Sequence, residues 1–114
     1  MNFSEFKTGP VRRVFAGLGQ EWVDLLQSAE DFENLRRSIV VRNARAIGSF
    51  ATAVRRYART CSCGELRLLL AACALVDFAH LSDELADGKA WKDMTRGCDR
   101  QHRAAIAACL MEAP

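Results

Sequence analysis

Proline is scarce in this chain: only Pro10 and Pro114 occur among its 114 residues. No segment shows the strict alternation of apolar and polar residues, or the turn-flanked clusters of β-branched residues, that are typical of strands. These two absences argue against a β-sandwich or barrel. The sequence therefore predicts an all-α fold, one helical bundle over residues 1–114 with about five helices, two short ones near the N-terminus and three longer ones.

Long apolar runs are also missing. The longest, residues 66–81, is interrupted by Arg67, Asp77 and His80 and falls short of the roughly 20 residues that a membrane span needs. The first residues lack the apolar stretch and small-residue cleavage site of a secretory signal. The five cysteines are an odd number without the spacing of a disulfide scaffold. We therefore expect a cytoplasmic protein without a membrane partner.

The size and charge of the chain fit one ordinary globular domain. Half of the residues are apolar and 26% are charged, with a formal net charge of only +2. The charge is unevenly distributed, because residues 1–60 carry ten basic and six acidic groups while residues 61–114 carry six and eight. This asymmetry fits either an internal pairing of the two halves or a basic surface offered to a partner.

Acidic residues are absent from residues 34–64, a stretch that contains seven arginines. On a helix with about 100° per residue, all of them except Arg36 fall within an arc of about 140°, opposite the apolar residues. The pattern is typical of an amphipathic helix with a basic face. The seven arginines are Arg36, Arg37, Arg42, Arg45, Arg55, Arg56 and Arg59.

Two residues interrupt this pattern, since Asn43 falls on the apolar side and Val41 on the basic side. A helix over about residues 31–60 would also be unusually long for a small domain. The sequence leaves two alternatives open, a continuous helix and one that is kinked near Arg42 and Asn43.

The N-terminal segment predicts two short helices. Pro10 suits the first position of a helix, and Gly17 and Gly19 are expected to end that helix. The second short helix should end near Ser28, which is placed to cap the arginine helix. The apolar residues of these two helices are Val11, Val14, Phe15 and Leu18, followed by Trp22, Leu25 and Leu26.

A capping box of Ser62 and Glu65 predicts a helix that starts at Cys63 or Gly64. This helix, expected at about residues 64–87, is apolar around most of its circumference in its first half and should lie at the centre of the fold. A second copy of the chain would also cover such a helix, so homodimerisation is an open alternative.

Gly88 is placed to end the central helix, and a last helix should follow from residue 89 or 90 to about Met111. Its apolar face has a spacing of three to four residues. The residues of that face are Trp91, Met94, Cys98, His102, Ala105, Ile106, Cys109 and Leu110.

The arginine face is the candidate binding surface. A planar guanidinium group can donate two parallel hydrogen bonds to a carboxylate or a phosphate. Arginine, tryptophan and methionine are also enriched in protein interfaces. The leading hypothesis is a small non-enzymatic interaction or regulatory protein, such as an inhibitor or adaptor, that binds the acidic surface of a protein partner. The candidate partner-binding residues are Arg42, Arg45, Arg55, Arg56 and Arg59.

Nucleic acid is the alternative partner for the same face. Against it stand the low net charge, the lack of a helix-turn-helix pattern, and the lack of aromatic residues for base stacking, because Tyr57 is the only one near the arginines. A further alternative gives the arginines no binding role, as a solvated helix face.

Four residues of zinc-binding type form a second candidate site. The single residue between the first two cysteines is tighter than the spacing of two to four residues common in zinc sites. The cysteines otherwise serve as small apolar residues. The zinc candidates are Cys61, Cys63, Cys98 and His102.

A second metal hypothesis depends on a continuous central helix, which would place several ligand-type residues on one stripe. A di-iron bundle needs a Glu-x-x-His pair from each of two helices, whereas this chain has one Asp-x-x-His. Asp77 is instead expected to meet an arginine of the basic helix or a backbone donor, because a lone buried carboxylate is costly. The stripe consists of Cys73, Asp77, His80, Glu84 and Asp87.

No catalytic motif accompanies these features. A nucleophilic Cys61 or Cys63 would need a positioned base, for which only His80 and His102 are candidates. We therefore expect neither enzymatic activity nor a cofactor.

Overall fold

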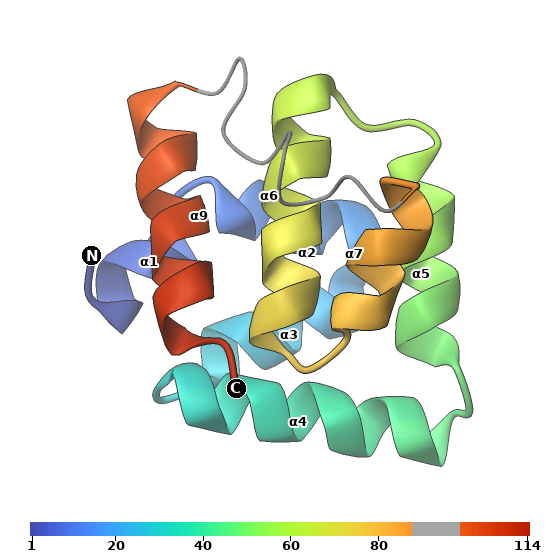
Figure 1. The fold of residues 1–114 in the computed structure, drawn as a ribbon. Helices are drawn as coiled ribbons and strands as arrows, with labels where there is room; N and C mark the ends of the chain where they lie inside the picture. The colour runs from blue at the N-terminus through green and yellow to red at the C-terminus, as the bar shows by residue number, and fades with distance from the viewer. Residues whose placement is uncertain (88–98) are drawn as a thin grey trace.

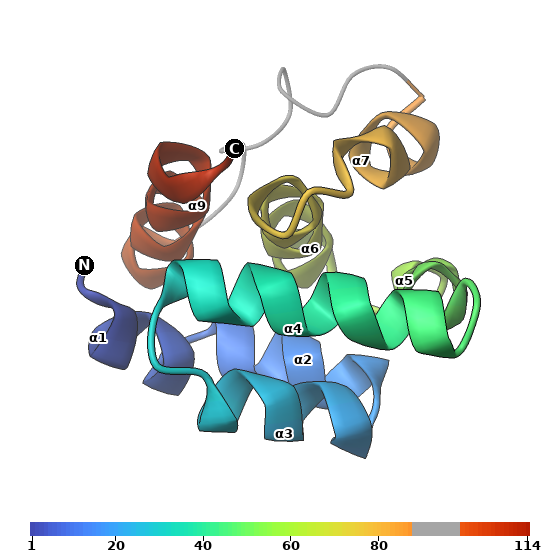
Figure 2. The same cartoon turned by 90° about the horizontal axis from the view of Figure 1, so that it is seen from below.

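The central helix predicted from its apolar circumference is at the centre of the structure. This computed structural model describes residues 1–87 and 99–114, which contain eight helices and no strand. α6 (Cys63–Leu75) is surrounded by four other helices, α2 (Val11–Leu18), α5 (Ser49–Ala58), α7 (Ala79–Leu85) and α9 (Arg100–Glu112) (Figures 1 and 2). The all-α prediction is confirmed, although the described residues form eight helices and not about five.

The burial of α6 is complete over its second half. Every residue from Leu68 to Leu75 is at most 4% exposed. The chain itself provides this cover, so the apolar character of α6 does not require a second copy. The predicted start is also confirmed, because α6 begins at Cys63 after the Ser62 cap, whose hydroxyl accepts from the backbone N–H of Glu65.

The predicted central helix over about residues 64–87 is wrong in its second half. α6 ends at Leu75, and Asp77 adopts a left-handed conformation with φ 70°, which aspartate tolerates better than most residues. The chain then folds back as α7, where the Ser82 hydroxyl donates to the Leu70 carbonyl at 2.6 Å. The Phe78 ring packs against Phe50 of α5 at 5.0 Å between centroids, a contact that a straight helix would not provide.

The N-terminal prediction is largely confirmed. α2 and α3 (Gln20–Ser28) bury the expected residues except Leu25, which is half-buried. Gly19, with φ 139°, separates the two helices. Gly17 does not end α2; it admits the Tyr57 ring, because a Cβ there would lie 2.2 Å from Cε1 of that ring. α1 (Phe3–Thr8) precedes them and was not predicted.

The arginine helix is broken into two. α4 (Phe32–Arg45) runs along one end of the molecule, and α5 then rises from its far end in a different direction (Figure 1). The expected Ser28 cap is wrong, since Ser28 ends α3 and the Asp31 carboxylate caps α4 by accepting from the N–H of Asn34 at 2.7 Å.

The break lies at residues 46–48, three residues beyond the expected kink. Gly48 takes the left-handed conformation with φ 73°. The Asn43 side chain accepts from the backbone N–H of Phe50 at 2.9 Å, and the Asn43 carbonyl accepts from the N–H of Gly48. Asn43 therefore caps the start of α5 from the preceding helix, which explains a polar residue on the apolar side.

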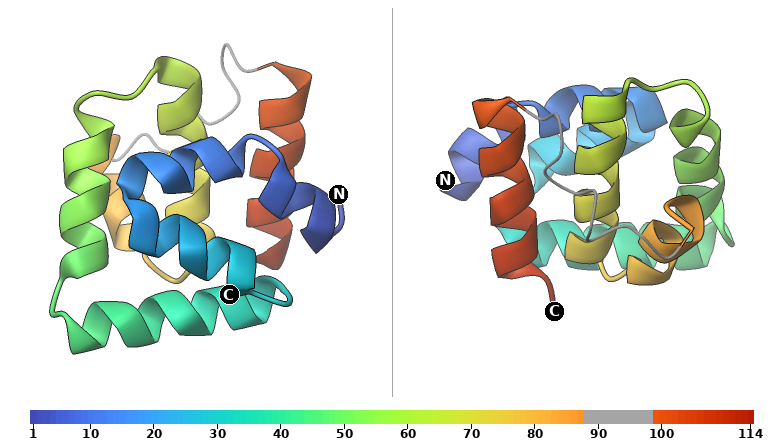
Figure 3. Two further views of the ribbon diagram at one scale, coloured as in Figure 1. Left: turned by 180° about the vertical axis from the view of Figure 1, so that it is seen from behind. Right: turned by 45° about the horizontal axis from the view of Figure 1, so that its top comes forward.

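Of the remaining helices, α2 and α9 pack against α6, and α3 packs against α2. In the left view of Figure 3, which is seen from behind, α2 and α3 lie in front of α6, between α5 and α9. In α9 the predicted Ala105, Ile106 and Cys109 are buried. The earlier part of that prediction, with Gly88, Trp91, Met94 and Cys98, lies outside the described residues.

None of the helices in the described ranges is both long and apolar enough to cross a membrane, and the longest, α4, has 14 residues.

The corner between α4 and α5 generates a stability prediction. Asn43→Ala removes the acceptor for the Phe50 N–H and should lower the free energy of unfolding by about 0.5–2 kcal/mol, as for other helix caps. Asn43→Asp keeps an oxygen at that position and should recover most of the loss. Urea denaturation measures both variants, and equal losses would show that the cap does not hold the corner.

Candidate functional site

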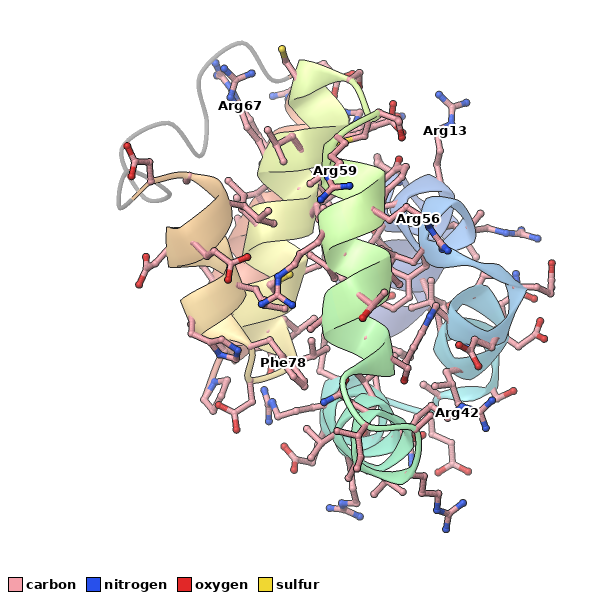
Figure 4. All side chains as sticks on the ribbon, turned by 90° about the vertical axis from the view of Figure 1, so that its right-hand side faces the viewer. Arg13, Arg42, Arg56, Arg59, Arg67 and Phe78 are labelled. Atoms are coloured by element: carbon pink, nitrogen blue, oxygen red, sulfur yellow. The ribbon has the colours of Figure 1, made fainter. Side chains whose placement is uncertain are left out.

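The corner at residues 46–48 divides the five predicted binding arginines into two groups. Arg42 and Arg45 belong to α4, whereas Arg55 and Arg56 belong to α5 and Arg59 follows its end. Figure 4 shows Arg42 beside α4, apart from Arg56 and Arg59 on the face of α5. Of the two alternatives that the sequence left open, the continuous helix is wrong, and the five arginines do not form one continuous stripe.

In the α5 group, Arg55 forms an ion pair with Glu84 of α7. Its Nε and Nη2 atoms donate to the two carboxylate oxygens at 2.7 and 3.0 Å. These hydrogen bonds hold the pKa of Glu84 below its usual value. An arginine from the first half of the chain thus pairs with a carboxylate from the second half, in line with the internal-pairing alternative.

Arg56 also forms a contact within the chain, to the end of α2. Its Nη2 donates to the carbonyl of Leu18 at 2.8 Å, at the last residue of α2. The carbonyls at the end of a helix lack partners within that helix, and a cation there also suits the helix dipole. The Arg59 side chain is exposed and forms no ion pair or hydrogen bond within residues 1–87 and 99–114. One of the three α5 arginines is therefore available to a partner.

Arg36, which the helical projection set apart, is the most deeply engaged arginine. Its Nε donates to the carbonyl of Leu75 at 2.8 Å, and its other nitrogens bond the Glu33 carboxylate and the carbonyl of Glu112. One guanidinium group thus ties α4 to the C-terminal ends of α6 and α9.

The α4 group borders a groove between α3 and α4. These two helices lie side by side, joined by residues 29–31 (Figure 2). The groove has a volume of about 340 Å³ and combines an apolar wall with three guanidinium groups. Its lining residues are Leu25 of α3 and Arg37, Ser38, Val41, Arg42 and Arg45 of α4.

The three arginines of the groove differ in their partners. Arg42 binds Glu21 of α3, with Nη2 and Nε at 2.6 and 3.2 Å from one carboxylate oxygen. Nη2 of Arg37 lies 3.8 Å from Oε1 of Glu33, and the Arg37 side chain is 70% exposed. The Arg45 side chain is exposed and forms no hydrogen bond or ion pair in the part of the chain that the structure describes. The groove therefore retains positive charge that its own acidic residues do not neutralise.

Exposed apolar side chains accompany this charge. Val41 is 43% exposed within the groove, and Val40 is 40% exposed on the adjoining ridge of α4. Ile47, at the corner, is 94% exposed. In the sequence, Val41 on the basic side was interpreted as a sign of a kink; it is instead the apolar part of the groove, which the helical projection of one helix cannot reveal.

A larger depression of about 870 Å³ lies between α1, α2 and α9. Its rim mixes Arg12 and Arg13 with Glu5 and Asp99. Asp99 already accepts from Nδ1 of His102 at 2.9 Å. Charges of both signs give this depression no clear preference for a ligand.

The stripe proposed for a second metal site does not form, because the helix breaks before Asp77. Cys73 is fully buried, whereas Asp77, His80, Glu84 and Asp87 are exposed. Within residues 1–87 and 99–114 the Asp77 side chain does not meet an arginine or a backbone donor, in contrast to the expectation.

The zinc candidates are tested only in part. Cys61 and Cys63 border the start of α6, His102 lies in the first turn of α9, and Cys98 lies outside the described residues. Within the described residues no three His, Cys, Asp or Glu side chains are grouped for a metal ion.

The surroundings of Cys61, in the turn before α6, disfavour its thiolate form. Burial, followed by the nearby Glu65 carboxylate, raises the pKa of the Cys61 thiol. A catalytic cysteine requires the opposite shift, because the thiolate is the nucleophile. The surroundings of Cys61 therefore do not favour nucleophilic chemistry.

Glu65, in the first turn of α6, is the centre of a hydrogen-bond cluster next to Cys61. The Tyr57 hydroxyl donates to its carboxylate, and the Ser62 hydroxyl donates to it at 2.7 Å. These bonds lower the pKa of Glu65, while burial and the Glu65 charge raise that of Tyr57. The cluster links the end of α5 to the start of α6.

Comparison with protein-family models finds no match, and neither do comparisons with curated proteins and with solved structures.

The Glu65 cluster predicts a pH dependence of stability. Because the pKa of Glu65 is lower in the folded protein than in the unfolded chain, its contribution is present above the unfolded value of about 4.3 and is lost as the pH falls through the folded value. Glu65→Gln should remove this part of the acid-side loss of unfolding free energy. Urea denaturation from acid to neutral pH measures it, with Glu30→Gln as the control. An unchanged pH profile in Glu65→Gln would contradict the assignment.

Proposed function

We propose that this protein is a non-enzymatic interaction module that binds an acidic segment of a partner protein in the groove between α3 and α4. The observation that carries the proposal is the combination, in one groove, of three arginines with an apolar wall formed by Leu25 and Val41. Two of the five arginines chosen from the sequence, Arg42 and Arg45, belong to it, and Arg37 replaces the α5 arginines.

The chemistry of the groove suits a protein better than a nucleic acid. Guanidinium groups bind carboxylates and phosphates alike, but the apolar wall contributes only when a partner brings apolar side chains. Base stacking needs exposed aromatic rings. Trp22 is buried, and Tyr57 packs on Gly17 and bonds Glu65, so neither is presented for stacking.

A nucleic-acid partner remains the alternative function. It would use the α5 side, where the Arg59 side chain is unpaired among the described residues; Figure 4 shows Arg13 and Arg56 on this side of the molecule as well. A role as an inhibitor or adaptor in the cytoplasm accords with binding through a small groove, and it is part of the proposal.

The proposal predicts that charge reversal in the groove abolishes partner binding. Affinity capture from the native cell, with and without nuclease, compares the wild type with an Arg37→Glu, Arg45→Glu double variant. We expect the double variant to lose a protein that the wild type retains after nuclease treatment, because reversed charges repel the acidic segment and leave the apolar wall unused. A loss of at least tenfold in captured partner is expected.

A matched control separates the groove from the total charge. Arg59→Glu, Arg103→Glu changes the net charge equally but lies outside the groove, and both residues are exposed. This variant should retain the partner. Equal loss in both double variants would contradict the groove as the binding surface, and loss of the captured partner on nuclease treatment would favour the nucleic-acid alternative.

A further inference from the structure

Glu21 of α3 forms an ion pair with Arg42, the arginine between Arg37 and Arg45 in the groove. Its carboxylate oxygen accepts from Nη2 and Nε of Arg42, and the two side chains are 42% and 48% exposed. Both are therefore accessible to solvent and to a partner. A carboxylate of the chain itself thus lies where the proposed partner would place one.

The remaining groove residues have a regular spacing along α4. Arg37, Val41 and Arg45 follow one another at intervals of four residues, which corresponds to about 6 Å of axial rise each. They share one side of the helix, with the apolar residue midway between the two arginines. A helix laid along the groove would meet charge, apolar surface and charge in that order.

This spacing has a complement in a second helix. A helical segment with two carboxylates separated by the same number of residues as Arg37 and Arg45, and an apolar residue midway, would present all three groups to their counterparts at once. The two outer groups of the partner helix are expected to be acidic, because they would face Arg37 and Arg45. The Arg45 side chain is unpaired within the described residues, and Arg37 is only loosely associated with Glu33.

We infer that the partner segment is an amphipathic acidic helix of this register, and that Glu21 competes with it by binding Arg42 in the free protein. The inference rests on the proposed function. Docking places the apolar residue of the segment on Val41 and Leu25 and its carboxylates on Arg37 and Arg45. Arg42 becomes available for a third carboxylate only when Glu21 releases it. Glu21 therefore lowers the affinity for acidic partners. Partners that present all three groups of this spacing bind in spite of this competition.

A synthetic peptide tests both parts. The designed peptide carries two glutamates at the Arg37 to Arg45 separation with a leucine midway, a third glutamate directly after the leucine, and alanine and glutamine elsewhere as helix formers. A scrambled peptide has the same composition with the four residues adjacent to one another. NMR titration of the isotope-labelled full chain gives the dissociation constant and locates the binding site.

We expect the designed peptide to shift the signals of Val41 and Arg45 and to bind more tightly than the scrambled one. Glu21→Gln should tighten binding of the designed peptide about two- to five-fold, the range for releasing an exposed ion pair. The control is Asp83→Asn, which removes one exposed negative charge from α7, away from the groove. That variant should bind as the wild type does.

Each other outcome overturns a defined part. If Glu21→Gln binds no more tightly than Asp83→Asn, Glu21 is not a competitor, although the docking surface stands. Equal binding of the designed and scrambled peptides would overturn the register. If neither peptide shifts the groove signals in any of the three proteins, the docking surface of the proposed function is itself wrong.

Discussion

The burial of α6 is the constraint on which the rest of this structure depends. A helix that is apolar on every side cannot face water anywhere, so other helices must surround it. The chain provides them from both directions: α2 and α5 precede α6, and α7 and α9 follow it. The end of α6 at Leu75 and the reversal at Asp77 follow from the same need, because the return places α7 against α6 and the Phe78 ring against Phe50.

Arginines complete this packing at the helix ends. The last carbonyls of a helix have no partner within it, and a buried carbonyl without a donor is costly. Arg36 donates to the carbonyls of Leu75 and Glu112, and Arg56 donates to that of Leu18. A guanidinium group suits this task because it has five donors and keeps its charge. Several of the arginines in residues 34–64, a stretch without acidic residues, therefore form bonds within the fold.

The corner between α4 and α5 decides what remains for a partner. Because the chain turns at Gly48, the arginines of α4 and α5 face different neighbours, and only α4 pairs with α3 to form a groove. The groove combines Arg37 and Arg45, which hold no close ion pair among the described residues, with the apolar side chains of Val41 and Leu25. Its binding character thus arises from two helices that meet, and neither helix has it separately.

Features that depend on residues close together in the chain can be predicted from the sequence alone. The Ser62 cap, the start of α6 at Cys63, the separation of α2 and α3 at Gly19 and the buried faces follow from local hydrogen bonds, backbone freedom and helical periodicity. Gly48 was a further local signal for the corner that the helical projection did not use.

The breaks in the two long predicted helices, and the arginines left unpaired among the described residues, depend on contacts that form only in the folded chain. Asn43 caps α5 across the corner, Phe78 finds Phe50, and Arg55 finds Glu84 of α7. Each of these contacts joins residues that only the path of the chain brings together, so their energies do not enter the periodicity of any one segment. The candidate site follows the same rule, because Arg42 and Val41 acquire their roles from Glu21 and Leu25 of another helix.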